Sequence, residues 1–332
     1  MGKLSPEELK KLLSCIKKDS RVIIPPTVGY DSGVHLFDGK YIIVASDPCI
    51  GVPEEWFGWL LVNYAASDVA LSGAKPEFCT INLLAPKSTK PETFQKIMNQ
   101  TCMAADELDV AIVRGHTGMY DVISGLLGVA TVYGAVQLEK LITPANAKPG
   151  DLILCTKPLG LETVTNFALI HQKLAEELFG ATQQEKLSRQ VRMQSCVREA
   201  QHLAKTDVVH AMHDATEGGF VAGLNELAEA SGVGFKVDWE KIPISREVLA
   251  LQNYFNLSDE QVLSMSSTGT VLAAVDAQAT EKVTAALRQI GLTAYFLGEF
   301  TENKERVLIK IGKEMLFPQV ADDPYPLILA QK

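Results

Sequence analysis

Residues Asn63 to Pro76 read NYAASDVALSGAKP, and the rest of the chain is organised around this segment. It places one carboxylate, Asp68, inside a small and apolar segment that breaks off at Gly and Pro. Apolar residues recur with helical spacing from Trp56 to Leu71, so we expect a largely buried helix there. A buried charge needs a cation, a hydrogen-bond donor or a metal as its partner, and the alternative is that Asp68 caps the loop that follows.

The composition bounds the class of protein. The chain has 332 residues, of which 47% are hydrophobic, so it can form two domains with separate cores. Its net charge is −9 with acids and bases interspersed, which argues against a nucleic-acid partner. The six cysteines form no CxxC pair, which favours reduced thiols over a zinc or disulfide framework. Because no signal peptide or membrane span is evident, we expect a cytoplasmic protein with no membrane partner.

Short strands and helices alternate along the N-terminal half. We expect helices at residues 6–18, 56–71 and 91–108, the first capped by Ser5, and strands at 40–45, 78–84, 111–113 and 126–136. Asp47 then lies at the exit of a strand, and residues 114–118 form a loop after the next-to-last strand. Both segments are therefore expected to be free to meet a ligand.

A turn at residues 148–151, KPGD, divides the chain, and we expect domains at 1–147 and 148–332. In the second half we expect helices at 162–179, 182–205, 220–231 and 279–291, and strands at 152–156, 208–212, 234–237, 271–275 and 294–300. This order favours two α+β domains over a doubly wound sheet.

Four polar segments combine glycine, a carboxylate or imidazole, and a hydroxyl. They are residues 29–32 (GYDS), 46–47 (SD), 115–117 (GHT) and 213–219 (HDATEGG). Glycine lets backbone N–H groups approach an anion, hydroxyls donate to phosphate oxygens, and spaced carboxylates hold Mg²⁺. We therefore expect Asp31, Asp47 and Asp68 to bind a metal, although an Asp in a glycine-containing turn also has a purely structural interpretation.

The segment 213–219 opens a helix with two glycines, and a helix N-terminus suits an anion; a capping box built on Thr216 or Asp214 is the alternative. His116 and His213 flank such segments and suit a general base, a metal ligand or a structural hydrogen bond. The sequence contains no GxxxxGK[ST] loop and no GxGxxG fingerprint, so the common nucleotide folds are not supported. Cys49 follows Asp47-Pro48 as a candidate nucleophile, but a buried thiol is the favoured interpretation.

These segments together resemble the superfamily of aminoimidazole ribonucleotide synthetase, thiamine-monophosphate kinase, selenophosphate synthetase and the hydrogenase maturation protein HypE. Residues 67–76, SDVALSGAKP, resemble the family's Asn/Ser-Asp-x-Ala-x-x-Gly-Ala-x-Pro, which is the most specific of the matches. Residues 29–34 are similar to the kinase's GDDAAV and residues 46–47 to its Thr-Asp. Residues 115–117 are similar to Gly-Asp-Thr of the kinase and HypE, and residues 213–219 to HypE's DPTRGG, so the HypE branch is the most similar.

The resemblance implies an α+β, two-domain PurM-like fold, in which an N-terminal α/β domain forms a sheet or barrel with a second subunit and a C-terminal α+β domain follows. It implies a homodimer that binds ATP and Mg²⁺ and transfers a phosphoryl group to an oxygen of a small-molecule or carrier-protein substrate. Asp47, His116 and Asp214 would be catalytic, and Asp31, Asp47 and Asp68 would hold the metal. The nucleotide would be bound by Asp31, Ser32, Gly115, Thr117, Thr216, Gly218 and Gly219.

The chain departs from the family pattern at several positions. His116 and Tyr30 stand where the relatives have acids, and Glu217 stands where HypE has Arg. HypE ends in a Cys that carries its substrate, whereas this chain ends LAQK, so we expect that the HypE dehydration does not run on a terminal Cys here. Two alternatives remain open: a small-molecule kinase akin to thiamine-monophosphate kinase, and a non-catalytic nucleotide-binding maturation subunit.

Overall fold

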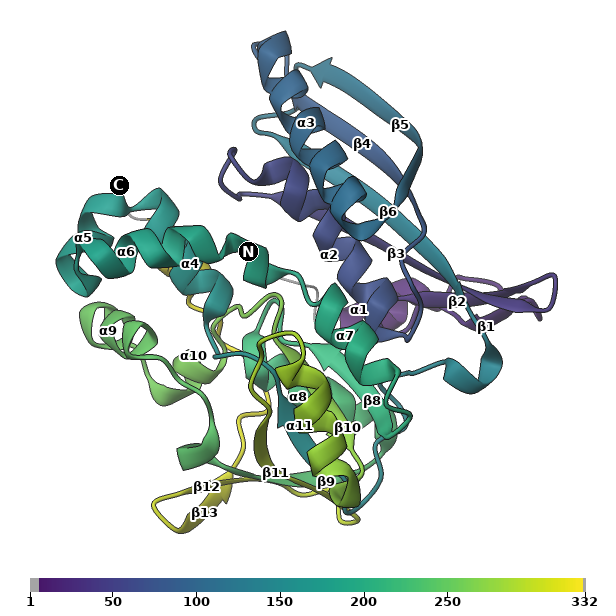
Figure 1. Cartoon of the computed structure of the whole chain (residues 1–332), viewed down its shortest axis with the longest axis vertical. Helices are drawn as coiled ribbons and strands as arrows, with labels where there is room; N and C mark the ends of the chain where they lie inside the picture. Colours follow the sequence, from purple (N-terminus) through teal and green to yellow (C-terminus); the bar gives the residue numbers. More distant parts are fainter. Residues whose placement is uncertain (1–5, 331–332) are drawn as a thin grey trace. The chain divides into compact units, whose positions relative to one another are not determined.

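The computed structural model describes residues 6–330, which form two compact units. We call Leu13–Leu141 the N-terminal unit, and residues 142–330 together with 6–12 the C-terminal unit. Each unit combines helices with its own mixed sheet, which confirms the predicted α+β class (Figure 1). The expected domain limits at 147/148 stay a prediction, and the expected cap Ser5 lies outside the described residues. Within residues 6–330, no helix is both long and apolar enough to cross a membrane.

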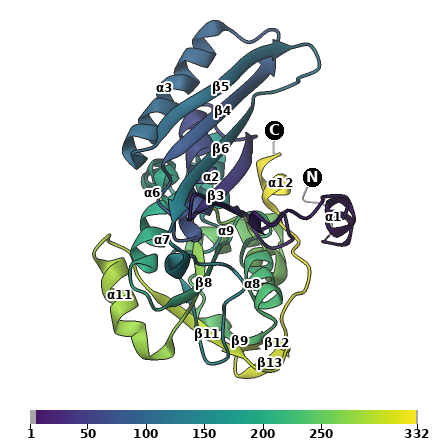
Figure 2. The same cartoon turned by 90° about the vertical axis from the view of Figure 1, so that its right-hand side faces the viewer.

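The N-terminal unit is built on a six-stranded sheet with the order β1-β2-β3-β6-β4-β5. Its strands are β1 (Val22–Ile24), β2 (Gly33–Phe37), β3 (Lys40–Ile50), β4 (Phe78–Pro86), β5 (Ala111–Tyr120) and β6 (Leu127–Val136). β4 and β5 are parallel and are joined by α3 (Pro91–Leu108), whereas the other neighbours are antiparallel. Figure 2 shows α3 running alongside β4 and β5.

The first helix, α1 (Pro6–Leu13), ends earlier than the predicted residue 18, because residues 14–20 are exposed and have no apolar face to bury.

The helix predicted at residues 56–71 is α2 (Phe57–Leu71), and it is buried on nearly every side. Small residues let the backbone of α2 approach its neighbours closely. A Cβ added at Gly58 would lie 2.2 Å from the carbonyl oxygen of Ile97 on α3. A Cβ added at Gly128 of β6 would lie 2.9 Å from the side chain of Leu61 on α2. α2 is therefore held between α3 and the sheet.

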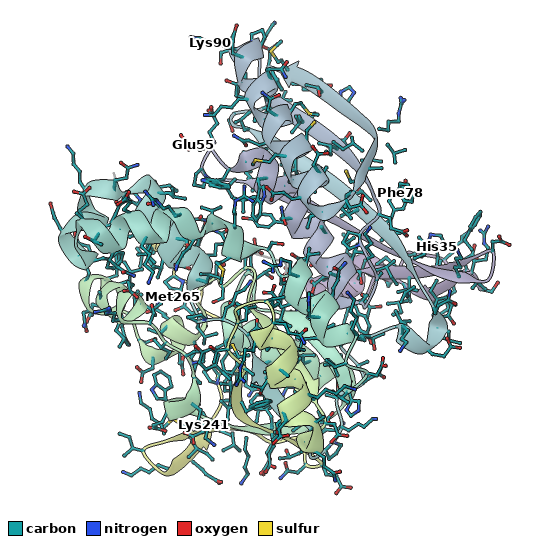
Figure 3. All side chains as sticks on the ribbon, viewed as in Figure 1. His35, Glu55, Phe78, Lys90, Lys241 and Met265 are labelled. Atoms are coloured by element: carbon teal, nitrogen blue, oxygen red, sulfur yellow. The ribbon has the colours of Figure 1, made fainter. Side chains whose placement is uncertain are left out.

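The two faces of this sheet differ. Along β6, Ala130 and Val132 are buried on the face that α2 covers, while the alternating residues are only half-buried. On the other face, which we call the open face, the rings of Phe78 and Tyr133 stack with centroids 5.4 Å apart. Phe78, labelled in Figure 3, is 41% exposed although it is a large apolar residue. The open face thus combines apolar side chains with exposure to solvent.

The C-terminal unit is built on a seven-stranded sheet with the order β13-β12-β9-β11-β7-β10-β8. Its strands are β7 (Leu152–Cys155), β8 (Val209–Asp214), β9 (Gly234–Asp238), β10 (Val271–Val275), β11 (Tyr295–Thr301), β12 (Arg306–Lys310) and β13 (Lys313–Leu316). Its main helices are α4 (Leu161–Ile170), α5 (Gln172–Phe179), α6 (Ala181–Ser188), α7 (Val197–Ala204), α8 (Gly219–Ser231), α9 (Arg246–Phe255), α10 (Asp259–Leu263), α11 (Thr280–Arg288) and α12 (Tyr325–Leu329).

Two cores stabilise this unit. In the first, α8 packs its apolar face against the sheet around Phe220 and Phe235. In the second, helices gather around Phe167 and Met265, the latter labelled in Figure 3. The helix predicted at 162–179 is divided at His171, whose ring packs on Phe167 and whose Nε2–H donates to the carbonyl of Leu329 at 3.2 Å. The helix predicted at 182–205 is likewise interrupted by a 3₁₀ turn, η2 (Arg189–Gln194), before α7 begins.

We predict that Gly58→Ala destabilises the protein by up to about 2 kcal/mol. The new methyl group would overlap the α3 backbone in a packed core at a cost of about 1–3 kcal/mol, and alanine recovers about 1 kcal/mol of this through its higher helix propensity. Urea unfolding followed by circular dichroism measures the change. Gly125→Ala is the matched control, because nothing lies within 4 Å of the added Cβ. Equal stability of the two variants would contradict the close approach of α2 and α3.

Candidate functional site

Asp47 lies inside a strand and not at its exit, which corrects the prediction from sequence. β3 continues past it to Ile50 and pairs with β6 throughout, with Asp47 opposite Ala130. Pro48 suggested a break, but β2 pairs with β3 only as far as Val44, so Pro48 stands where that side of β3 is a sheet edge. A proline at such an edge leaves no ladder hydrogen bond unmade.

The side chain of Asp47 belongs to the face of the sheet that α2 covers. Side chains alternate along a strand, so Asp47 shares a face with Ala45 and Cys49. Both of these are buried, and the Cys49 thiol lies 3.7 Å from the carbonyl oxygen of Phe57 at the start of α2. Asp47, which is half-buried, therefore faces the same layer that contains α2.

Asp68 lies in the last turn of α2 and is only 7% exposed. The C-terminal end of a helix carries partial negative charge, which adds to the charge of the carboxylate, and the last turn of α2 contains no basic residue. One turn further on, the hydroxyl of Ser72 is 2.7 Å from that of Ser32, which directly follows Asp31. The structure thus brings the segment of Asp31 to the helix end that carries Asp68.

The pairing of β2 with β3 places Asp47 near the segment that contains Asp31. Gly33, two residues after Asp31, pairs with Val44, three residues before Asp47. The three predicted metal ligands therefore come from the end of α2, the segment before β2 and the middle of β3. Carboxylates are oxygen donors of the kind that suits Mg²⁺, but the oxygens of these three do not all lie within 4.8 Å of one another, so the metal site stays a prediction. Beside Asp31, burial raises the pKa of Tyr30, which stays a neutral phenol at pH 7.

Residues 115–117 are part of strand β5 and do not form the loop predicted from sequence. They pair with residues 81–83 of β4, and a Cβ added at Gly115 would lie 2.5 Å from the carbonyl oxygen of Ile81. Gly115 thus allows a close strand contact where the sequence suggested a chain break. Thr117 pairs with the buried Leu83, whereas His116 pairs with the exposed Asn82 on the open face.

His116 is therefore separated from Asp47 within one copy of the chain. The two side chains stand on opposite faces of the sheet. Their strands β5 and β3 are three positions apart in the order β3-β6-β4-β5, which corresponds to about 14 Å. The structure brings the segment of Asp31 to the end of α2 that carries Asp68, and it leaves His116 on the opposite face of the sheet from Asp47.

In the C-terminal unit, strand β8 extends to Asp214 and carries His213 and Asp214 opposite Leu272 and Val271 of β10. Both side chains are almost fully buried. The imidazole Nδ1–H of His213 donates to the carbonyl of Asp214 at 2.8 Å, and its Nε2 lies 2.9 Å from a carboxylate oxygen of Glu226 on α8. Glu226 was not among the residues predicted from sequence, although it lies only twelve positions from Asp214.

The predicted phosphate-binding glycines are closely packed at the start of α8. The backbone N–H of Gly218 donates to the carboxylate of Asp323 at 3.1 Å. A Cβ added at Gly219 would lie 2.3 Å from the carbonyl oxygen of Met265. Thr216 beside them is half-buried. An internal carboxylate thus occupies the N-terminal end of α8, and sequence reasoning did not single out Asp323.

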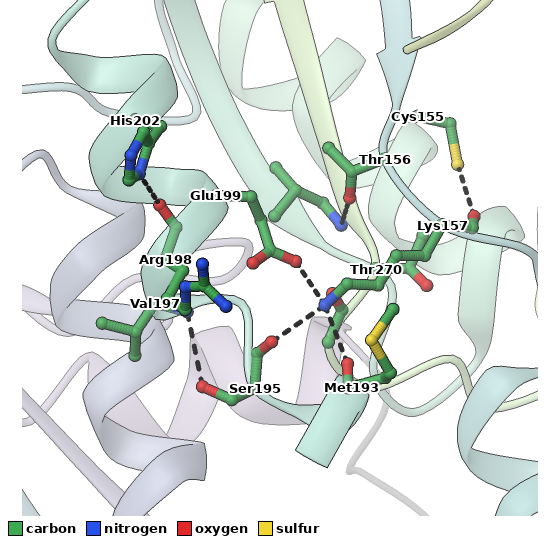
Figure 4. Close-up of polar contacts among 12 residues, drawn as sticks. Cys155, Thr156, Lys157, Met193, Ser195, Val197, Arg198, Glu199, His202 and Thr270 are labelled. Atoms are coloured by element: carbon green, nitrogen blue, oxygen red, sulfur yellow. Dashed lines mark hydrogen bonds and ion pairs between the residues drawn. The ribbon is translucent and has the colours of Figure 1, made fainter. Parts of the chain in front are cut away.

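A buried lysine organises a second polar cluster of the C-terminal unit (Figure 4). The ammonium group of Lys157 donates at 2.8 Å to the carbonyl oxygens of Met193, Ser195 and Gly269. It also forms an ion pair with Glu199 on α7, and both side chains are less than 5% exposed. Lys157 therefore joins the end of β7 to the link before α7 and to the segment that enters β10.

Within residues 6–330, none of the six cysteines forms a disulfide. Burial raises the pKa of Cys155 to about 12 and that of Cys79 to about 11, so both remain protonated thiols at neutral pH. Cys49 is fully buried beside α2, which agrees with its interpretation as a small core residue. These buried thiols lack the exposed, electropositive surroundings that make a cysteine nucleophilic.

Fold and sequence together define a two-domain α+β protein of the PurM-like type. Residues 29–136 match the family described as AIR synthase related protein, N-terminal domain, and residues 148–310 match the corresponding C-terminal domain. The chain belongs to the AIR synthase related protein family. It is 30% identical over 276 residues to the carbamoyl dehydratase HypE of Cupriavidus necator, an alignment that covers 80% of this chain and 74% of the relative.

Two solved structures share the fold. The hydrogenase maturation protein HypE in complex with ATP has a TM-score of 0.72 at 19% identity, covering 96% of this chain and 91% of that chain. AaThiL complexed with AMPPCP and TMP also has a TM-score of 0.72 at 19% identity, covering 93% of both chains. At these identities the two likenesses establish the fold alone.

We predict that Lys157→Met destabilises the protein by about 3–5 kcal/mol, because it leaves the carboxylate of Glu199 buried without its cation. The double variant Lys157→Met/Glu199→Leu recovers part of the loss, since no buried charge then remains. Lys75→Met is the control: it removes an exposed ion pair with Asp109 and costs at most about 1 kcal/mol. Chemical unfolding measures the stability of all three variants. If Lys157→Met lost no more stability than the control, the buried ion pair of Lys157 with Glu199 would not stabilise the protein as predicted.

Proposed function

We propose that this protein is a homodimeric, Mg-ATP-dependent enzyme of the HypE-like type that activates an oxygen of a small or carrier-bound substrate by phosphoryl transfer. Membership of the family and the relative named carbamoyl dehydratase support this proposal. So does the likeness to a HypE that was crystallised with ATP. The cysteine thiols, which form no disulfide within residues 6–330, favour the cytoplasm as its location.

One observation carries the proposal: the contact of Ser32 with Ser72, which joins the segment of Asp31 to the end of α2 that holds Asp68. A chain with a net charge of −9 repels a nucleotide triphosphate unless a cation lies between them. Asp31, Asp47 and Asp68 would hold Mg²⁺, and the bound ion would neutralise charge on the phosphates. It would also offset the unfavourable placement of Asp68 at the negative end of α2.

The remaining predicted residues would position the phosphates. Ser32 and Thr117 offer hydroxyl donors, and Gly115 offers a position without a side chain. Thr216, Gly218 and Gly219 would do the same at the start of α8, where Gly218 would first have to release Asp323. Asp47, His116 and Asp214 stay the predicted catalytic residues. In phosphoryl transfer such groups act mainly by positioning and charge neutralisation.

We predict that Asp47→Asn and Asp68→Asn each weaken Mg-ATP binding by about tenfold or more, because even outer partners of a bound metal contribute about 10–100-fold to affinity. Calorimetric titration of ATP with and without Mg²⁺ measures the effect. Asp38→Asn is the matched control, since Asp38 is exposed in the β2–β3 turn and its positive φ of 48° also suits asparagine.

The outcomes of this titration separate the candidates. Binding that requires Mg²⁺ and is lost in both variants supports the proposal, and wild-type affinity in Asp68→Asn removes this residue from the site. Absence of binding in the wild type contradicts the proposal and favours a scaffold that has lost its nucleotide, whereas tight Mg-ATP binding without turnover on any acceptor supports the non-catalytic nucleotide-binding subunit. With binding established, product analysis decides between enzymes: a dehydrating enzyme releases free phosphate, whereas a kinase leaves a phosphorylated product. The likeness to AaThiL complexed with AMPPCP and TMP keeps the kinase as the second candidate.

The homodimer is proposed from the exposed edge and open face of the N-terminal sheet. β5 is an edge strand, and long unpaired edges with apolar residues invite pairing with another chain. Val113 on β5 and Phe78 on β4 are 56% and 41% exposed. Exposed apolar area of this kind favours a subunit interface over solvent.

We predict that Phe78→Lys converts the dimer into a monomer, because a charge on the open face would be buried without a partner in the interface. Light scattering after size-exclusion chromatography measures the mass. Val122→Lys is the control, since Val122 is 90% exposed in the loop between β5 and β6. A wild-type protein that is monomeric at all concentrations would contradict the proposal.

A further inference from the structure

His116 and Tyr120 form a side-chain pair on strand β5. The imidazole Nε2 of His116 lies 2.8 Å from the phenol oxygen of Tyr120. The two rings are nearly parallel, with an interplanar angle of 28° and centroids 6.5 Å apart. Both residues pair with β4 positions on the open face, His116 with Asn82 and Tyr120 with Pro86.

Gly118 makes this contact geometrically feasible. Residues four apart in a strand are separated by about 13 Å, so upright side chains at these positions do not meet. Tyr120 instead leans back along the strand over Gly118. A Cβ at Gly118 would lie 2.6–2.8 Å from three atoms of the Tyr120 side chain. The φ of Gly118 is not positive, so the position uses the missing side chain of glycine and not its backbone freedom.

The contact constrains the chemistry of His116. A neutral imidazole has one N–H and one lone pair, so the role of Nε2 toward the phenol determines the role of Nδ1. If the phenol donates to Nε2, Nδ1 carries the hydrogen and becomes a donor; if Nε2–H donates, Nδ1 becomes an acceptor. Across residues 6–330, Nδ1 of His116 makes no hydrogen bond, so it is the ring nitrogen left for a ligand.

We propose that Tyr120 is a positioning residue for His116: it fixes the tautomer and the ring plane so that Nδ1 is presented to the nucleotide phosphates or to the metal shell. This inference rests on the proposed function, in which His116 takes part in the site. Tyr120 itself touches no substrate, and Gly118 provides the space for its ring. The alternating residues His116, Gly118 and Tyr120 thus act as one unit on one face of β5.

The first test observes the tautomer without any nucleotide. Two-dimensional NMR of the full chain labelled with ¹⁵N-histidine separates Nδ1 from Nε2, and His116→Asn assigns the signal. We expect one dominant tautomer in the wild type and a shift toward a mixture of both in Tyr120→Phe and in Gly118→Ala. Tyr254→Phe is the control, because Tyr254 is an exposed tyrosine on α9. Unchanged ring-nitrogen signals in both test variants would overturn the proposal.

The second test is a double-mutant cycle on Mg-ATP affinity. We expect Tyr120→Phe to weaken binding by about 2- to 12-fold, the range that the net contribution of one hydrogen bond gives. In the His116→Asn background the same substitution should have no further effect, since Tyr120 acts through His116. An equal loss in both backgrounds would overturn the positioning role. If the wild type binds no Mg-ATP but the tautomer shifts, the pairing stands and the proposed function fails.

Discussion

The N-terminal unit depends on one constraint, the enclosure of α2 by apolar neighbours on nearly every side. Gly58 and Gly128 remove the side chains that would hold α2 away from α3 and β6. An enclosed helix is a costly place for a carboxylate, because a charge removed from water requires compensation. Asp68 nevertheless lies there, in the last turn, where the helix dipole opposes it as well. The enclosure of α2 thus places Asp68 at the helix end where the proposed metal site would use it.

Much of the fold could be predicted from the sequence. α2, α3 and most strands of the N-terminal unit agree with the hydrophobic pattern, because each buries a single well-defined face or is enclosed completely. Strands β1 and β2 were not predicted, and two further errors fall at residues that usually break a strand. Pro48 is tolerated because β3 has become an edge there, and Gly115 serves the close approach of β4. In both cases the proline or glycine lies inside a strand, at a sheet edge or at a close contact between strands. Only the pairing with the neighbouring strand distinguishes such a residue from one in a loop.

The C-terminal unit shows which features need the tertiary structure. Lys157 and Glu199 are separated by 42 positions, and nothing local to either residue indicates that they meet in the interior. Three carbonyl groups and one carboxylate surround the ammonium group, so the cost of burying the charge is offset only when η2, α7 and the entry to β10 are all in place.

The helix breaks at His171 and after Ser188 also arise from packing, because the local sequence there continues to favour helix. The candidate acids stay predictions from the sequence, and the separation of His116 from Asp47 became visible only in the strand order and register.

That separation connects the proposed activity to the proposed dimer. Asp47 faces the layer of α2, whereas His116 and Tyr120 stand on the open face, three strand positions away. A triphosphate with its Mg²⁺ cannot contact both sides of one sheet across that distance. If the acids and His116 serve one reaction, the imidazole has to come from the β5 strand of a second copy. A monomeric variant should then keep the contribution of Asp68 to metal binding and lose the contribution of His116. If the monomeric variant kept both contributions, His116 would not act on this reaction from a second copy of the chain.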